Sequence, residues 1–138
     1  MIGQTVAIYR DRQSGEYRVQ PCARAGGVPQ EFGPQVILPA SVSDEILLNI
    51  VLENLPKTET QKYEQSLAPK YVGEDYRVML KRDKLINVEQ CGGEYRLIPF
   101  KRMRNSFGSM DGLTRTVAAG EFLATGGALV RQMFEDIS

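Results

Sequence analysis

One heptapeptide occurs twice in this chain, and the two copies lie 78 residues apart. Residues 15–21 read GEYRVQP, and residues 93–99 read GEYRLIP. The same spacing places Ile8 on Ile86, so the similarity extends beyond the heptapeptide. Self-similarity at this scale constrains architecture, because each copy is expected to fold as one supersecondary unit. We therefore predict a chain built from two related half-repeats.

Each half-repeat reads as three strands followed by one helix, a βββα-like unit. The first unit covers approximately residues 5–56 and contains a hairpin turn at 11–15. The second covers approximately residues 83–136 and contains a turn at 90–93. Loops are expected at residues 26–34 and 105–112. The expected strands are residues 5–9, 17–21, 35–38, 85–89, 95–100 and 113–117.

The two predicted helices are amphipathic. Ser41 or Ser43 can cap the first helix, and acidic residues follow in its first turn, where the helix dipole favours them. Gly126 and Gly127 weaken the second helix by about 1 kcal/mol each relative to alanine. The helix is therefore expected to begin late, to kink there or to admit a close packing partner. The expected core residues are Ile46, Leu47, Ile50, Val51 and Leu55 in the first helix, and Phe122, Leu123, Leu129, Val130, Met133 and Phe134 in the second.

A connector at residues 57–82 separates the two units. A stretch of this length is uncommon as a bare linker, so we expect a short helix near residues 60–67 and a strand at 76–80. Hairpins impose antiparallel pairing, and a strand set must cover its apolar face with a helix. The sequence therefore predicts a single α+β domain over residues 1–138, with a largely antiparallel sheet packed with two main helices.

The sequence contains no histidine. This excludes Ser-His-Asp and Cys-His catalysis, histidine-ligated zinc and the usual general base at neutral pH. Phosphate-binding loops, dinucleotide-binding glycine patterns and metal-ligand clusters are absent as well, so we expect no catalytic residue, no cofactor and no metal. A small enzyme that uses a carboxylate or Cys91 is a third, weaker hypothesis, because a reactive thiol needs an activating cation or helix end. Cys22 follows a strand and is expected to be buried or incidental.

Charge and hydropathy restrict the class of partner. The 17 basic residues balance 17 acidic ones, whereas phosphate binding normally leaves a basic excess, so nucleic acid is not the expected partner. No window approaches the ~20 apolar residues of a membrane helix, and no signal peptide is evident, so we expect a cytoplasmic protein. The alternative hypothesis is a nucleic-acid-binding or regulatory domain that uses the basic second hairpin. Its basic residues are Lys81, Arg82, Lys84, Arg96, Lys101, Arg102 and Arg104.

The repeated GEYR motif has a functional and a structural interpretation. Glu16 with Glu94, and Arg18 with Arg96, can build a symmetric site. Glycine also suits a tight hairpin turn, tyrosine suits a strand with a polar tip, and glutamate and arginine pair across strands. We favour the structural interpretation.

Recognition is expected where the two copies differ, which is in the connector and in the loops at residues 26–34 and 105–112. Tyrosines anchor protein interfaces, and carboxylates steer basic partners. The same tyrosines can instead close the open side of the sheet. The predicted partner-binding residues are Glu64, Tyr71, Glu74, Asp75 and Tyr76.

Three stretches resemble bacterial contact-dependent growth inhibition (CDI) immunity proteins. They are QVILPASVSDEIL at residues 35–47, the AGG and FGP triplets within residues 25–34, and GGEYRLIP at residues 92–99. The resemblance covers most of the chain apart from the connector. It implies a small cytosolic protein without a catalytic site, which neutralises the toxic C-terminal domain of an effector, often a nuclease, by stoichiometric occlusion. The chain departs from the family in its even charge, because nuclease inhibitors are often clearly acidic.

Overall fold

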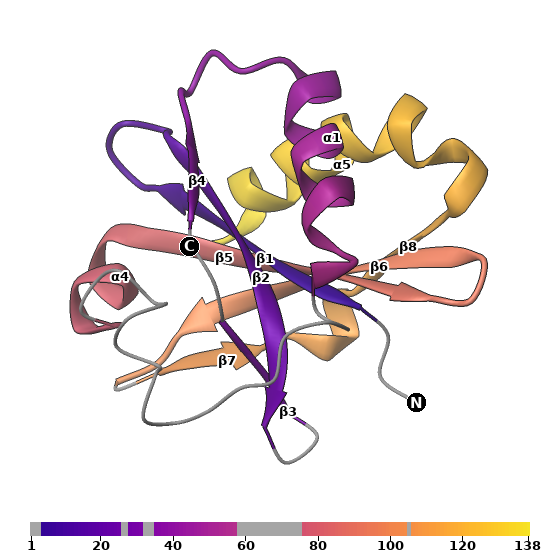
Figure 1. Cartoon of the computed structure of the whole chain (residues 1–138). Helices are drawn as coiled ribbons and strands as arrows, with labels where there is room; N and C mark the ends of the chain where they lie inside the picture. The colour runs from indigo at the N-terminus through magenta and orange to yellow at the C-terminus, as the bar shows by residue number, and fades with distance from the viewer. Residues whose placement is uncertain (1–3, 26–27, 32–34, 58–75, 105) are drawn as a thin grey trace.

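The computed structural model describes residues 4–25, 28–31, 35–57, 76–104 and 106–138. Its strands are β1 (Thr5–Asp11), β2 (Tyr17–Ala25), β3 (Val28–Glu31), β4 (Val36–Leu38), β5 (Asp83–Cys91), β6 (Glu94–Arg102), β7 (Phe107–Ser109) and β8 (Arg115–Ala118). They form one twisted sheet in the order β3-β2-β1-β5-β6-β7, with β4 also paired to β2 and β8 to β6 (Figure 1).

Two main helices, α1 (Asp44–Asn54) and α5 (Phe122–Asp136), lie beside each other on one face of this sheet (Figure 1). A third helix, α4 (Tyr76–Arg82), precedes β5, and two short 3₁₀ turns, η2 (Asp111–Leu113) and η3 (Ala119–Glu121), flank β8. All strand pairs in the described part of the chain are antiparallel. The predicted α+β class, an antiparallel sheet with two main helices, is confirmed.

The strand order is the same when read outward from either central strand. β1 and β5 pair at the middle, with Ile8 opposite Ile86, and each continues into a hairpin partner, β2 or β6, which carries two short edge strands. Tyr17 and Tyr95 are both buried near the start of these hairpin partners. The duplication itself stays a prediction, which a superposition of the two halves would test.

The two hairpin turns differ in length. In the first hairpin the Asp11 N–H donates to the Glu16 carbonyl oxygen, which leaves four residues in the turn, and Gly15 has a φ of 76°. In the second hairpin Cys91 faces Glu94, and Gly92 has a φ of 60°. Positive φ values of this kind favour glycine. Because the second turn is two residues shorter, a spacing of 78 aligns β2 with β6 but does not align their partner strands.

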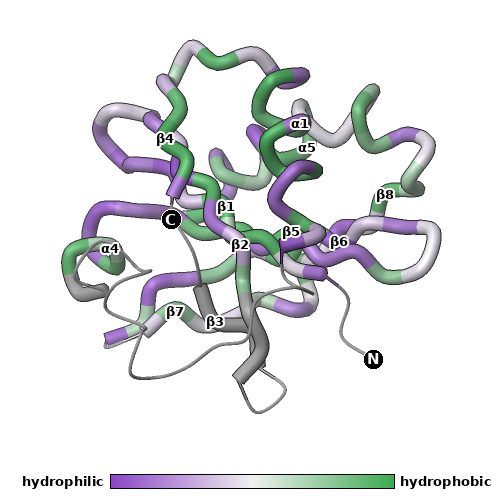
Figure 2. The backbone as a smooth tube through the Cα atoms, in the orientation of Figure 1, coloured by the Kyte–Doolittle hydropathy of each residue, from purple (hydrophilic) through white to green (hydrophobic). Residues whose placement is uncertain are grey.

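The main core lies between the sheet and the two helices, and Figure 2 marks its hydrophobic positions along α1 and the central strands. The predicted cap is present, since Ser43 Oγ accepts the Ile46 N–H at 3.2 Å. The predicted core faces are partly wrong: Ile46 is 53% exposed and Leu123 is 54% exposed, while Leu48 is fully buried. α1 contacts both β2 and α5, so its buried stripe is rotated from the one that the apolar spacing alone suggests.

The repeated tyrosines anchor α5 to the sheet. Tyr17 meets Phe134 edge-on, with ring centroids 6.0 Å apart, and Tyr95 stacks on Phe122 at 4.3 Å. Arg131 Nη1 also donates to Tyr17 Oη at 3.1 Å. Aromatic pairs of this kind contribute about 0.5–1.5 kcal/mol beyond their burial. The tyrosines of the GEYR motif therefore act in packing, as the structural interpretation expects.

α5 makes a close contact with the start of α1. At Gly127 an added methyl group would meet the Cβ of Asp44 and lie 2.7 Å from its Cγ. The Asp44 carboxylate accepts a hydrogen bond from Arg131 Nε, and this bond raises the pKa of Arg131. Arg131 Nη2 donates to the Val42 carbonyl oxygen at 2.5 Å. Gly127 is therefore present because the two helices approach closely, which was one of the three expectations for the glycine pair.

We predict that Gly127→Ala destabilises the protein, although alanine favours an isolated helix by about 1 kcal/mol. The added methyl group has to push α1 away from α5, and overpacking of this kind costs about 1–3 kcal/mol. Thermal melts of the variant should show a lowered midpoint. Gly120→Ala is the control, because its methyl group meets no atom within 4 Å. A raised midpoint for Gly127→Ala would contradict the close contact.

The opposite face of the sheet carries a smaller hydrophobic cluster, which includes Ala7, Tyr9 and Leu85. Met79 of α4 packs into this cluster and is fully buried. The predicted strand at residues 76–80 is therefore wrong, since these residues form α4. Residues 76–80 are rich in β-forming residues, but packing decides the element. The neighbours Met79 and Leu80 are both buried, whereas successive side chains of a strand on a sheet surface would alternate between buried and exposed.

The loops expected at residues 26–34 and 105–112 contain the strands β3 and β7 and part of η2. β2 and β6 are each nine residues long. β4 pairs only with the first part of β2, and β8 only with the first part of β6. Residues 22–25 of β2 and 100–102 of β6 pair with β3 and β7, which gives this part of each strand its hydrogen-bonding partners. The helix expected near residues 60–67 lies outside the described residues.

Candidate functional site

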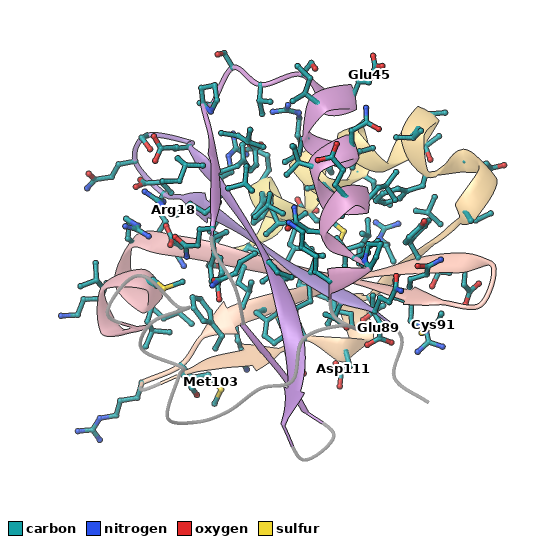
Figure 3. The ribbon with its side chains drawn as sticks, in the orientation of Figure 1. Arg18, Glu45, Glu89, Cys91, Met103 and Asp111 are labelled. Atoms are coloured by element: carbon teal, nitrogen blue, oxygen red, sulfur yellow. The ribbon has the colours of Figure 1, made fainter. Side chains whose placement is uncertain are left out.

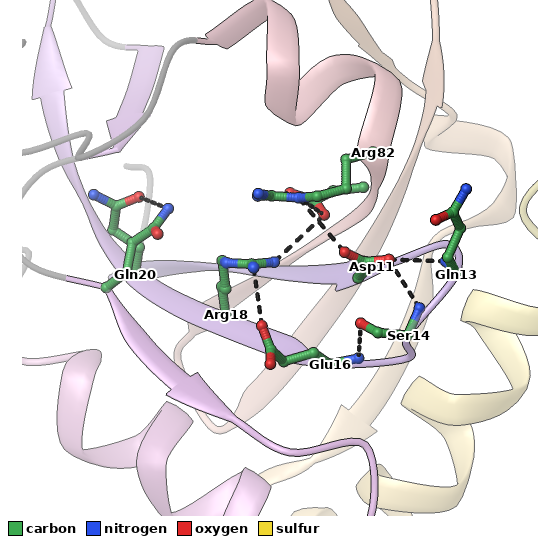
Figure 4. A network of polar contacts seen from close by, with 9 residues as sticks. Asp11, Gln13, Ser14, Glu16, Arg18, Gln20 and Arg82 are labelled. Carbon is green, nitrogen blue, oxygen red and sulfur yellow. Dashed lines mark hydrogen bonds and ion pairs between the residues drawn. The ribbon is translucent and has the colours of Figure 1, made fainter.

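A cluster of charged side chains joins β1, β2, β5 and α4 on the face of the sheet opposite α1 and α5 (Figure 4). At its centre is Asp83, which is fully buried. Arg82 donates two hydrogen bonds to its carboxylate, Nε to Oδ1 at 2.8 Å and Nη2 to Oδ2 at 2.7 Å. Arg18 Nη1 lies 3.6 Å from Asp83 Oδ1. This bidentate interaction fixes the Arg82 guanidinium in one orientation.

A second carboxylate enters the cluster from the neighbouring strand, because Asp11 lies opposite Asp83 in the β1–β5 register. Facing carboxylates repel each other, so the two arginines are needed to neutralise them. Asp11 Oδ2 is 3.8 Å from Arg82 Nε, and Arg18 Nη2 donates to Glu16 Oε1 at 2.9 Å. The cluster therefore ties α4 to the first hairpin.

Hydrogen bonds to the Asp11 carboxylate favour its ionised form. Burial alone would raise its pKa, but the backbone N–H groups of Ser14 and Gln13 and the cations Arg82 and Arg18 outweigh burial, so the pKa lies below its ordinary value. The two N–H groups reach Asp11 Oδ1 at 2.9 Å and 2.8 Å. Asp11 is therefore an anion at neutral pH and acts as a structural acceptor.

This lowered pKa predicts a loss of stability in acid. A carboxylate with a lowered folded-state pKa stabilises the fold fully above its unfolded pKa of about 3.9, and that stabilisation is lost as the pH falls through the folded pKa. Asp11→Asn should therefore be less stable than the wild type at pH 7, and acidification to pH 3 should cost it less. Urea unfolding at the two pH values measures both effects. Equal acid-induced losses in the two proteins would contradict this role of Asp11.

The predicted partner-binding residues fall mostly outside the described part of the chain, namely Glu64, Tyr71, Glu74 and Asp75. Tyr76 is the first residue of α4, and its side chain is not among the described ones. The described end of the connector is nevertheless well fixed, because Met79 is buried and the Arg12 N–H donates to the Arg82 carbonyl oxygen at 2.9 Å. The assignment of these residues to an interface stays a prediction.

The basic residues of the second hairpin do not form one uniform patch. Arg82 pairs with Asp83, Lys84 Nζ donates to the Phe134 carbonyl oxygen at 2.8 Å, and Arg96 lies 3.8 Å from Glu89. This last pair crosses from β6 to β5, and it joins the arginine of the second GEYR copy to a glutamate outside the motif. The remaining basic side chains are exposed, and they are Lys81, Lys101, Arg102 and Arg104.

Cys91 lies at the end of the second hairpin, next to Glu89 (Figure 3). Its Sγ is 3.0 Å from Glu89 Oε1. A carboxylate repels a thiolate, whereas a reactive cysteine needs a nearby positive charge. Cys22 is buried, in line with the expectation for it. Within the described residues, no group of three or more His, Cys, Asp or Glu side chains is placed to hold a metal ion, and no described helix is long and apolar enough to span a membrane.

Sequence reasoning missed a second polar site, which lies at the turn of the first hairpin. There Arg10, Arg12 and Lys84 line a pocket of about 350 Å³. Lys84 is 72 residues from Arg12 in the sequence, and only the pairing of β1 with β5 brings them together. The local sequence signal for this site was the alternation of basic and acidic residues at Arg10, Asp11 and Arg12, just before the turn.

Comparisons with known proteins identify the fold. No protein-family model and no curated protein matches the sequence. A protein of unknown function, NMB0488 from Neisseria meningitidis, superposes with a TM-score of 0.78 over 98% of this chain and 95% of its own, at 13% identity. A chain of the CdiA-CT/CdiI toxin and immunity complex from Yersinia pseudotuberculosis superposes with a TM-score of 0.69 over 100% of both chains, at 14% identity. The fold is therefore one that occurs in a CDI toxin–immunity complex.

Proposed function

We propose that this chain is an immunity protein that binds and neutralises the toxic C-terminal domain of a CDI effector. The observation that carries the proposal is the end-to-end structural likeness to a chain of a CDI toxin and immunity complex, which covers 100% of both chains. The sequence motifs at residues 35–47 and 92–99 point to the same family without reference to the fold.

The chemistry of the described residues supports a binding role. Histidine is absent from the sequence, Cys91 lies against a carboxylate, and the charged cluster around Asp83 pairs its acids with arginines. Each of these features suits a rigid scaffold that presents a surface. Inhibition would then follow from occlusion, either of the toxin's active site or of a surface next to it.

The proposed interface is the connector, with Glu64, Tyr71, Glu74, Asp75 and Tyr76. Its described end is held in place by Met79 and Arg82 of α4. A segment fixed at its end loses less conformational freedom when it binds, which favours affinity. The acidic side chains suit a basic partner, and a nuclease presents basic side chains to its phosphate substrate. We therefore propose a nuclease domain as the toxin.

Co-expression tests this function directly. The toxin domain encoded beside this chain should stop growth when expressed alone, and growth should recover when this chain is expressed with it. The control is an unrelated immunity protein expressed at the same level. Failure of this chain to restore growth, with both proteins soluble and present, would refute the proposal.

The alternative function, nucleic-acid binding by the second hairpin, would use the exposed cations Lys101, Arg102 and Arg104. A nucleic-acid-binding domain should bind generic RNA or DNA with an affinity that falls steeply as salt rises. Replacing these three residues with glutamine should then abolish the binding. We expect no such binding, because Arg82 and Arg96 already pair with carboxylates within the fold.

A further inference from the structure

The pocket at the turn of the first hairpin lies where three parts of the fold meet. The turn itself supplies residues 10–15, β5 supplies Lys84, and the last turn of α5 supplies Glu135. Its volume is about 350 Å³. Ala40, which precedes α1, closes one side of it. Elements from both ends of the chain therefore build it, and it exists only in the folded protein.

Three cations line this pocket, and their hydrogen-bonding capacity is only partly used. Lys84 Nζ donates to the Phe134 carbonyl oxygen at 2.8 Å, whereas an ammonium has three donors. Arg12 Nη1 donates to the Ser138 carbonyl oxygen at 2.8 Å, and the buried Nε of Arg12 has no hydrogen-bond partner among the described residues. A guanidinium has five N–H donors. Both side chains therefore keep donors for an additional acceptor.

The cations also repel one another. Burial lowers the pKa of Lys84, and the nearby Arg12 and Arg10 lower it further against the opposing effect of Glu135. Burial likewise lowers the pKa of Arg12, with Arg102 adding to the effect and Asp83 opposing it. An anion placed among these groups would relieve the repulsion and accept their unused hydrogen bonds.

The acidic residues of the pocket leave a positive excess. The Asp11 carboxylate is committed elsewhere, to the N–H groups of the turn and to Arg82. Glu135 is 3.7 Å from Arg10 Nη1, but its side chain is 70% exposed, so it can swing away at little cost. Arg10, Arg12 and Lys84 against Asp11 and Glu135 leave one positive charge, and they leave two when Glu135 turns away, which matches a dianion better than a singly charged carboxylate.

We infer that this pocket binds a phosphate group, through Arg10, Arg12 and Lys84. The group can be free inorganic phosphate or the phosphate of a small monoester, since the three cations recognise the same oxygens in both. The inference rests on the pocket alone and does not depend on the proposed immunity function.

Titration of the isolated protein with inorganic phosphate tests the inference. Backbone amide shifts of residues 10–15 and 84 should move and saturate, at ionic strength held constant with sodium chloride and at pH 8. Acetate should cause much smaller changes, because it carries one charge. Phenyl phosphate provides the second arm: binding as tight as that of phosphate assigns the site to a monoester, and much weaker binding assigns it to the free ion.

Two substitutions should act in opposite directions. Arg10→Gln should weaken phosphate binding by up to about fivefold, as loss of a partly exposed charge pair implies. Glu135→Gln should strengthen it by a smaller factor, because it removes a competing anion that already moves aside at little cost. Lys101→Gln, an exposed cation on β6 outside the pocket, should leave binding unchanged. Shifts that do not saturate, or equal effects of Arg10→Gln and Lys101→Gln in variants with unchanged melts, would overturn the inference.

Discussion

Asp83→Ala is expected to lower the free energy of unfolding by about 3 kcal/mol. The carboxylate is fully buried and receives two hydrogen bonds from Arg82, so its removal leaves that guanidinium without its main partner. Breaking a buried ion pair in this way costs about 3–5 kcal/mol. The lower end applies because Asp11 remains 3.8 Å from Arg82 Nε and keeps part of the charge neutralised.

Urea unfolding of three variants measures this effect. Asp83→Asn keeps the size and one acceptor, so it should lose less stability than Asp83→Ala. Asp111→Ala, on the exposed turn η2, should change the free energy of unfolding by less than about 0.5 kcal/mol. A loss below about 1 kcal/mol for Asp83→Ala would show that the cluster does not hold α4 to the first hairpin.

Tyr71→Ala is expected to weaken toxin binding by about 2 kcal/mol or more, roughly a thirtyfold rise in Kd. A tyrosine at the centre of an interface buries a large, rigid ring at little entropic cost, as interface anchors do. An exposed ring at this position predicts that folding is largely kept and that thermal melts change little.

Matched variants distinguish the loss of one anchoring side chain from a general disturbance of the connector. Tyr63→Ala removes the one connector tyrosine that is outside the predicted set, and it should have a smaller effect on Kd. Glu74→Lys and Asp75→Lys should mainly slow association, and the slowing should shrink as salt rises. Unchanged affinity for Tyr71→Ala, with an intact fold, would move the interface away from the connector, most directly to the exposed basic residues of the second hairpin.

Local sequence signals predicted a large part of this fold. Ser43 caps α1 because serine followed by acidic residues satisfies free N–H groups and the helix dipole. Tyr17 and Tyr95 lie in β2 and β6, the second strand of each hairpin, because β-formers after a glycine turn predict a hairpin. The expected strand at residues 76–80 was wrong because Met79 is buried in a cluster with Ala7 and Tyr9, which are distant in the chain.

The charged groups were harder to predict than the elements. Asp11 and Asp83 are far apart in the sequence, and only the β1–β5 register places them opposite each other. The basic run around Arg82 reads as a charged surface, although Arg82 pairs with a buried carboxylate. The pocket cations Arg10, Arg12 and Lys84 likewise converge through strand pairing. Local sequence patterns predict which face of a helix or strand is apolar, but they do not predict which charged residues of different strands come into contact.

Titration of the purified toxin domain with this protein tests the central claim most directly. If the chain is an immunity protein that acts by occlusion, the toxin's activity should fall linearly and reach zero at one equivalent, and the two proteins should elute as a single 1:1 complex. Toxin activity that persists at a severalfold excess of the folded protein, with no complex formed, would contradict the account.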